Sequence, residues 1–71
     1  MTLLPLLSGM EIVKKLAELG YIVDHQRGSH MRLKCLGKKS VTVPNYRTVS
    51  RGLLRKILRD ADLTPDEFIK L

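Results

Sequence analysis

The sequence predicts an α+β domain built as a two-layer sandwich, in the order helix, three antiparallel strands, helix, with a short extra helix at the C-terminus. Two segments with capping signals and helical spacing of apolar residues, 9–19 and 51–61, indicate the helical layer. Between them, residues 30–35 alternate apolar and polar side chains, as in a strand that packs one face on a core. Helices that bury one stripe and a sheet that buries one face pack together as two layers.

Length and composition set the first limits. With 71 residues the chain has room for one domain, residues 1–71, and a domain of this size buries only about 60% of its unfolded surface. The 44% hydrophobic and 28% charged residues are typical of globular proteins. The single cysteine, Cys35, excludes an internal disulfide framework and a cysteine-based zinc cluster, and it favours a reducing, cytoplasmic setting.

The first helix is expected over residues 9–19. Ser8 and Glu11 match a capping box, in which the serine hydroxyl accepts from the amide three residues on and the glutamate reaches back to the serine amide. Gly20 can adopt the left-handed conformation that ends many helices. The preceding run, residues 1–7, is apolar but short, lacks a basic residue and contains a proline, so we expect neither a signal peptide nor a membrane span.

Three β-prone runs predict an antiparallel meander. The first covers residues 21–23 and fades into a polar, turn-prone stretch at residues 24–28. The second, residues 30–35, is joined through a hairpin connection at residues 37–39 to the third, residues 41–43. In the second run the alternation directs Met31, Leu33 and Cys35 to the core and His30, Arg32 and Lys34 to the opposite face.

The C-terminal third predicts two helices. Ser50 is the expected cap of the first of them, and its apolar positions are Leu53, Leu54, Ile57, Leu58 and Ala61. Its opposite stripe carries Arg51, Arg55 and Arg59, each four residues from the next. The string Thr64-Pro65-Asp66-Glu67 combines a cap, a proline at the first helical position and a glutamate at the third, and so opens a short helix. We expect Phe68, Ile69 and Leu71 to fold back on the core.

The charge of the chain is unevenly placed. Its net charge is +6, and from Arg27 to Arg59 it has ten basic residues and no acidic one. A segment so one-sided projects a positive field, which indicates a polyanionic partner, RNA or DNA more often than a membrane or an acidic protein. The alternative, left open by charge alone, is a solvated surface with no partner.

Several chemistries fit the residues poorly. A zinc site would need about three converging ligands, but His30 and Cys35 face apart on one strand, and we expect His25 at the surface ahead of a turn. A serine hydrolase would need a buried carboxylate to orient a histidine, and no acid lies within the basic segment. No glycine-rich phosphate loop of either common spacing is present. We therefore expect no metal and no other cofactor.

Acid or base catalysis by His30 on a phosphodiester remains. RNA carries its own nucleophile, the 2′-OH, so cleavage needs a proton acceptor and donor near neutral pH and cations to stabilise the charged phosphorane. Histidine suits the first task, and arginine suits the second through bidentate contact with phosphate oxygens. DNA lacks the hydroxyl and would stay uncut. For an exposed histidine taken alone, a surface role without chemistry is the alternative.

Three strings, in this order and spacing, carry a family resemblance: Gly28-Ser29-His30, Val41-Thr42-Val43-Pro44 and Arg51-Gly52-Leu53-Leu54-Arg55-Lys56-Ile57-Leu58. They resemble the HicA toxin family, also called YcfA-like proteins, and the resemblance runs from Leu19-Gly20-Tyr21 to Leu63. It implies a double-stranded-RNA-binding-domain-like fold and a translation-independent mRNA endonuclease. It also implies neutralisation by a HicB-type antitoxin that covers the active face.

The resemblance implies one catalytic residue. The essential histidine of the family follows Gly-Ser, which maps onto His30 here. We expect Arg32, Lys34 and Arg51 to contact phosphate. Further expected RNA contacts are Gly28, Ser29, Lys38, Lys39, Tyr46 and Arg55. For Gly28 and Ser29 a turn without function is the alternative, and for Lys38 and Lys39 it is protection of a strand edge.

One position departs from the family. Many members carry a histidine shortly after the Val-Pro of the third strand, where this chain has Asn45 and Tyr46. Tyr46 either stacks on a base or packs against its own loop, and both interpretations stay open. The alternative for the whole chain is a non-catalytic RNA-binding module that uses the same cationic face. DNA binding and a purely structural role follow behind these two.

Overall fold

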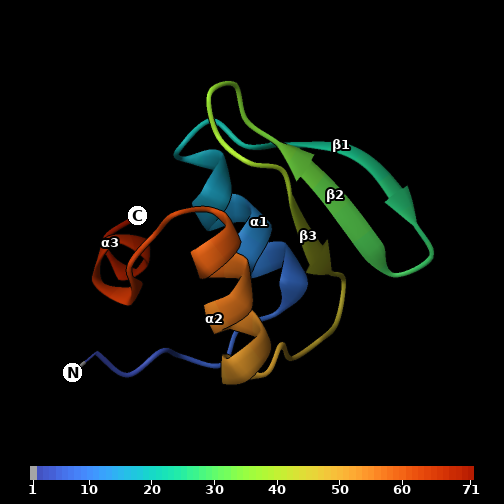
Figure 1. Cartoon of the computed structure of the whole chain (residues 1–71). Helices are drawn as coiled ribbons and strands as arrows, with labels where there is room; N and C mark the ends of the chain where they lie inside the picture. Colours follow the sequence, from blue (N-terminus) through green and yellow to red (C-terminus); the bar gives the residue numbers. More distant parts are fainter. Residues whose placement is uncertain (1) are drawn as a thin grey trace.

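The computed structural model describes residues 2–71; Met1, the first residue of the apolar N-terminal run, lies outside them. Along the chain the elements are α1 (Gly9–Ala17), β1 (Ile22–Arg27), β2 (His30–Lys34), β3 (Val41–Pro44), α2 (Arg51–Asp60) and α3 (Pro65–Ile69). The strands form one antiparallel sheet in the order β1-β2-β3 (Figure 1). The predicted α+β architecture with a short extra C-terminal helix is confirmed.

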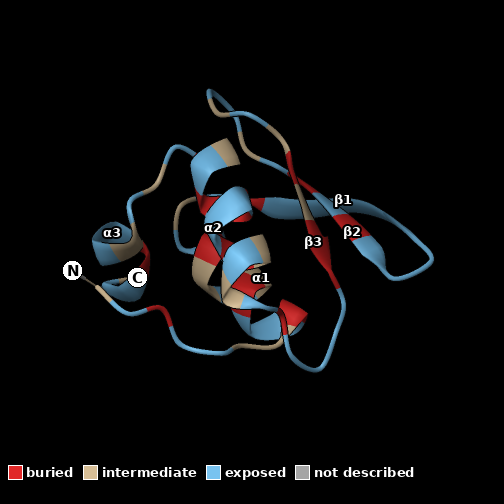
Figure 2. Ribbon diagram, turned by 60° about the horizontal axis from the view of Figure 1, so that its bottom comes forward, coloured by how far each residue is buried: buried red, intermediate tan, exposed pale blue. Residues whose placement is uncertain are grey.

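The helices and the sheet form two layers around one core. On β2 and β3 the side chains of Met31, Leu33, Val41 and Val43 are at most 2% exposed, and they pack with Ile12 and Leu16 of α1 and Leu54, Ile57 and Leu58 of α2. Each such side chain, when fully buried, stabilises the fold by about 1.5–3 kcal/mol. Burial is confined to β2 and β3, whereas β1 is exposed along its length (Figure 2). We call the sheet face that points away from the helices the open face.

The helix caps form as the sequence predicts. The Ser8 hydroxyl accepts from the Glu11 amide at 3.1 Å, and the Ser8 amide donates to the Glu11 carboxylate at 2.9 Å. Thr64 and Glu67 repeat both bonds at the start of α3. The hydrogen bond from the backbone of the capping residue lowers the pKa of each glutamate. Because the caps are local, they fix where each helix begins.

The first strand is longer than predicted. Residues 24–27, predicted to be part of a turn, continue β1, which pairs with β2 as far as Arg27 opposite His30. All six residues of β1 are exposed, so the strand shows no apolar alternation to reveal its length. Its register also shifts by a β-bulge between Val23 and His25. The turn therefore shrinks to Gly28 and Ser29.

Two other boundaries differ from the prediction. α1 ends at Ala17, two residues early, and a turn leads to Gly20, which has the expected left-handed conformation with φ +103°. In the C-terminal segment Phe68 is fully buried, as predicted, but Ile69 is 40% exposed. A helix as short as α3 turns about 100° per residue, so it presents one side chain, and not its neighbour, to the core.

Gly9 fixes the distance between α1 and the end of β3. Its amide donates to the carbonyl of Tyr46 at 2.9 Å. A Cβ at this position would overlap the carbonyl oxygen of Pro44 and approach the Cα of Asn45 to 2.9 Å. The close packing holds the segment after β3 against the first turn of α1, and so positions the loop that carries Tyr46.

Candidate nucleic-acid interface

His30 begins β2 and lies on the open face. Its neighbours in the strand, Met31 and Leu33, are 2% and 0% exposed, whereas His30, Arg32 and Lys34 are exposed. Successive side chains of a strand point to opposite faces, so the three polar residues share the face that the helices leave uncovered. This is the placement that the alternation predicts.

A two-residue turn precedes His30. Gly28 has φ +58°, a conformation that glycine adopts freely and that suits the first position of a tight hairpin turn. A Cβ at Gly28 would meet nothing within 4 Å, so the backbone angle, and not close packing within the chain, accounts for this glycine. The Ser29 carbonyl accepts from the Asn45 amide at 2.6 Å, which places the loop after β3 beside the turn.

The register brings two further residues of β1 onto the open face. Arg27 pairs with His30, and His25 pairs with Arg32. Directly opposed residues of antiparallel strands point to the same face, so these four side chains share one surface. They form a quadrilateral with the two histidine positions on one diagonal and the two arginine positions on the other.

The open face is cationic. On it the structure places Ile22, Asp24, His25 and Arg27 from β1, His30, Arg32 and Lys34 from β2, and Thr42 from β3. Asp24 is the one acid among these residues, against three permanent cations. Such a surface attracts the phosphate backbone of a nucleic acid, and the attraction weakens with salt.

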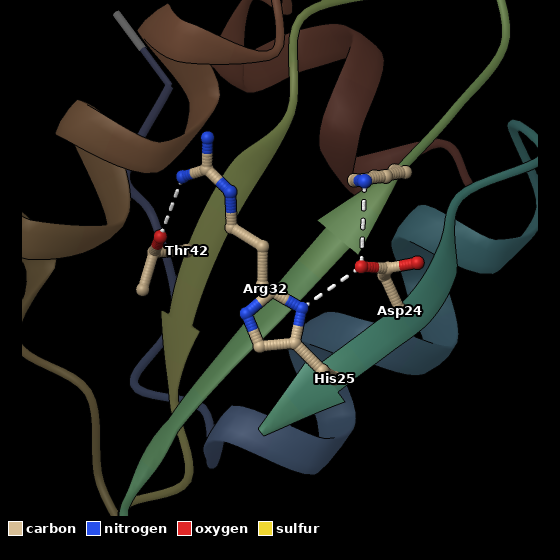
Figure 3. A network of polar contacts seen from close by, with 5 residues as sticks. Asp24, His25, Arg32 and Thr42 are labelled. Carbon is tan, nitrogen blue, oxygen red and sulfur yellow. Dashed lines mark hydrogen bonds and ion pairs between the residues drawn. The ribbon is translucent and has the colours of Figure 1, made fainter. Parts of the chain in front are cut away.

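Asp24 connects the two strands at the bulge. Its Oδ2 lies 2.8 Å from Nδ1 of His25 and 3.4 Å from Nζ of Lys34 (Figure 3). The hydrogen bond with His25, followed by that with Lys34, lowers the pKa of the Asp24 carboxyl. The carboxylate therefore stays ionised at neutral pH. The other ring nitrogen of His25 points away from Asp24 (Figure 3).

Arg32 extends across the middle of the sheet toward β3. Its Nη1 donates to the Thr42 hydroxyl at 2.9 Å (Figure 3). Arg32 and Thr42 are paired in the register, so the bond spans neighbouring strands on the open face. It holds the guanidinium over β3 rather than over β1, and leaves the His25 ring on the other side of β2.

Not all the predicted RNA contacts gather around His30. Tyr46 is 44% exposed in the loop that starts beside the turn, at the His30 end of the sheet. Lys38 and Lys39 lie in the β2–β3 connection at the opposite end, where with Arg59 they line a concavity of about 330 Å³. The structure therefore separates the two lysines from His30 by the length of β2.

The arginine stripe of α2 lies on the helical layer. Arg55 is exposed on the side of α2 that faces away from the core, and hence away from the open face. Arg51 is half-buried, and its Nε donates to the Leu4 carbonyl at 2.6 Å. Arg51 is thus anchored to the N-terminal segment, a contact that no sequence pattern predicts.

Three residues of the open face are not predictable from the sequence pattern: Asp24, His25 and Arg27. A stretch of polar residues next to a glycine is typical of a turn, and the bulge breaks the period-two pattern that would assign these residues to a face. The one available signal is that the run from Tyr21 to Arg27 contains neither glycine nor proline, which is compatible with a longer strand.

Other kinds of site find no support in the described part of the chain. Within residues 2–71 there is no group of three or more histidine, cysteine, aspartate or glutamate residues arranged to hold a metal ion. Cys35, half-buried just after β2, lies 3.6 Å from the Leu19 carbonyl and away from the open face. Over the same described stretch, no helix is both long and apolar enough to cross a membrane.

The open face presents two imidazoles among guanidinium and ammonium groups on a rigid, hydrogen-bonded sheet. These groups can bind phosphates and exchange protons near neutral pH. A comparison with curated proteins found no match. A model of the family described as HicA toxin of bacterial toxin–antitoxin systems matches residues 9–63, from the first residue of α1 to the turn after α2. The match covers the whole sheet and both long helices, and so the chain belongs to the HicA family of toxins, each of which acts in a pair with an antitoxin.

Proposed function

We propose that this protein is a metal-independent endoribonuclease that cleaves mRNA, with His30 as general acid or base. The observation that carries the proposal is the exposed imidazole of His30 directly opposite Arg27 on the open face, with Arg32 and Lys34 on the same strand. Membership of a toxin family supports it, because the destruction of mRNA stops growth.

The proposed reaction uses the RNA as its own nucleophile. The 2′-oxygen attacks the adjacent phosphorus and gives its proton to a base, while the bond from phosphorus to the 5′-oxygen breaks and that oxygen receives a proton from an acid. The products are a 2′,3′-cyclic phosphate and a 5′-hydroxyl. Arginine side chains stabilise the extra negative charge of the transition state, and one positioned acid or base typically contributes 10²–10⁴-fold.

The substrate is proposed to lie across the His30 end of the open face. Arg27, Arg32 and Lys34 would hold its phosphates there, with Gly28, Ser29 and Tyr46 along the border. The remaining expected contacts, Lys38, Lys39, Arg51 and Arg55, would meet only RNA that extends beyond the open face. A rigid sheet suits this task because it keeps the acid–base group and the cations in fixed positions.

A HicB-type antitoxin is proposed to cover the same surface. The open face combines cations with the exposed apolar side chain of Ile22, which is 66% exposed, and the adjacent Val23 is 43% exposed. An acidic protein with a few apolar side chains would complement both features and exclude RNA. We place the toxin, its antitoxin and its mRNA substrate in the cytoplasm.

The test compares three substrates of one sequence in the presence of EDTA: RNA, the same RNA with 2′-O-methyl groups throughout, and DNA. The nuclease is expected to cut the RNA alone and to leave 2′,3′-cyclic phosphate ends. If the protein binds all the RNA but leaves it intact, it is a non-catalytic RNA-binding module. Loss of cutting on addition of EDTA would contradict the metal-independent mechanism.

A further inference from the structure

His25 shares the open face with His30, at a position that fits a second proton transfer. Arg27 is paired with His30 and lies two residues from His25 on the same strand, so the two histidines occupy diagonal positions. Residues at diagonal positions of neighbouring strands lie about 7–8 Å apart, within reach of long side chains. Two imidazoles placed in this way can contact opposite sides of one phosphate group.

Asp24 fixes the orientation of the His25 ring. With the carboxylate oxygen 2.8 Å from Nδ1, the ring places its Nδ1–H on Asp24, and the neutral imidazole then presents the lone pair of Nε2. The bulge makes the contact, because it directs two successive residues of β1 to one face. Lys34 holds the other side of the carboxylate at 3.4 Å. An imidazole held by a carboxylate is oriented as a proton acceptor, and the carboxylate stabilises the imidazolium that forms.

We infer that His25 is the general base that takes the 2′-OH proton and that Asp24 is its positioning residue, with His30 the general acid that protonates the 5′-oxygen. This assignment rests on the proposed ribonuclease function and divides its two proton transfers between the two histidines of the chain. Protons balance, since His25 gains one, His30 loses one, and a proton exchange with water restores both. His25 thereby becomes a catalytic residue with no counterpart in the family motif around His30.

The charged groups that face the two imidazoles are few. From β1 they are Asp24 and Arg27, and from β2 they are Arg32 and Lys34. β3 contributes Thr42 and Pro44 at the positions paired with β2, and neither ionises. The pH dependence of cleavage therefore reports mainly on the two histidines, and a base and an acid acting together give a bell-shaped profile.

The first experiment measures single-turnover cleavage of one RNA as a function of pH for the wild type, His25→Ala, Asp24→Asn and Asp24→Glu. His25→Ala is expected to lower the rate at least about 100-fold and to remove the low-pH limb, since that limb belongs to the base. Asp24→Asn is expected to lower the rate less and to move the same limb to lower pH, because the carboxylate no longer favours the protonated ring. Asp24→Glu should retain most of the activity.

The matched control is Ile22→Ala, an exposed substitution on the same strand and face that removes no ionisable group. Its rate is expected to equal that of the wild type within about threefold. Binding of a 2′-O-methyl RNA is measured in parallel and should be unchanged by His25→Ala. A parallel loss of binding and cleavage, or full activity of His25→Ala, would contradict the assignment.

The second experiment separates the base from the acid. In an RNA whose 5′-oxygen at the mapped cut site is replaced by sulfur, the leaving thiolate needs no protonation. His30→Ala is expected to regain activity on this substrate, whereas His25→Ala is expected to stay impaired. The reverse pattern would overturn the assignment of roles. If the wild type leaves RNA intact, the proposed ribonuclease fails; if the wild type cuts and His25→Ala cuts equally well, only the role of His25 fails.

Discussion

Arg27 and His30 face each other directly across the turn formed by Gly28 and Ser29. The pair places a permanent positive charge beside the imidazole at the most exposed end of the sheet. Because the turn has two residues and the strands on either side are hydrogen-bonded, the spacing between the two backbones is fixed. A phosphate bound by Arg27 would therefore lie within reach of His30.

The first prediction concerns Arg27 and the salt dependence of RNA binding. Each phosphate neutralised on single-stranded RNA contributes about −0.7 to the slope of log affinity against log salt. Arg27→Ala is expected to reduce the size of this slope by about 0.7 and to weaken binding at low salt. The measurement is a titration with 2′-O-methyl RNA at several salt concentrations. Lys70→Ala removes the same charge from the end of α3, away from the sheet, and should leave the slope unchanged.

A second prediction contrasts two glycines. Gly9→Ala is expected to destabilise the protein by about 1–3 kcal/mol, because the backbone of α1 must move away from Pro44 and Asn45. Gly52→Ala should instead stabilise it by about 0.5–1 kcal/mol, since nothing lies within 4 Å of the added Cβ and alanine favours the helix. Urea denaturation of both variants checks the signs. Equal effects would contradict the close packing of α1 on the end of β3.

The third prediction is a loss of stability in acid. Hydrogen bonds from the backbone of Ser8 and Thr64 lower the pKa of Glu11 and Glu67 in the folded state. A carboxyl whose pKa is lower in the folded than in the unfolded state adds stability at higher pH, and this stability is lost as the pH falls, here roughly between pH 5 and 3. The melting temperature should drop over that range.

Substitution of both capping glutamates checks the cause. Glutamine keeps the hydrogen bond of the capping box but does not titrate, so the double variant Glu11→Gln, Glu67→Gln is expected to lose less stability between pH 5 and 3 than the wild type. Glu18→Gln, just beyond the end of α1 and outside both capping boxes, is the control and should follow the wild type. An identical drop in all three proteins would exclude the caps as its source.

The fourth prediction concerns the two arginines of α2. Arg51→Ala is expected to lower the free energy of unfolding by about 1.5–3 kcal/mol, the usual range for a hydrogen bond to a charged group, because it leaves the Leu4 carbonyl without its donor. Arg55→Ala, one turn along the same stripe and exposed, should change stability by less than about 0.5 kcal/mol. Thermal unfolding of both variants measures the difference. Similar values would mean that the contact of Arg51 with Leu4 adds little.

Much of the fold is predictable because its signals are local. The caps at Ser8, Ser50 and Thr64 depend on residues within one helical turn, and all three form as predicted. The alternation in β2 depends on a core that covers one face, so the pattern of residue types correctly predicts that His30 is exposed. Where burial or capping drives an element, residue types alone reveal it.

The rest depends on contacts between distant parts of the chain. β1 is an edge strand with no buried residue, so its polar sequence reveals neither its length nor the bulge that turns Asp24 and His25 to one face. Gly9 and Arg51 are likewise explained only by Pro44 and Leu4, each more than thirty positions away. The paired register, rather than any motif, brings His25 and Arg27 to the site.

The most direct test of the account is the rate at which wild-type protein and His30→Ala cleave one RNA in EDTA, with affinity for the 2′-O-methyl form measured alongside. We expect His30→Ala to lose at least about 100-fold in rate, with its melting temperature and RNA affinity unchanged, because the side chain is exposed and carries the proton transfer. Equal cleavage by the two proteins would contradict the central role of His30.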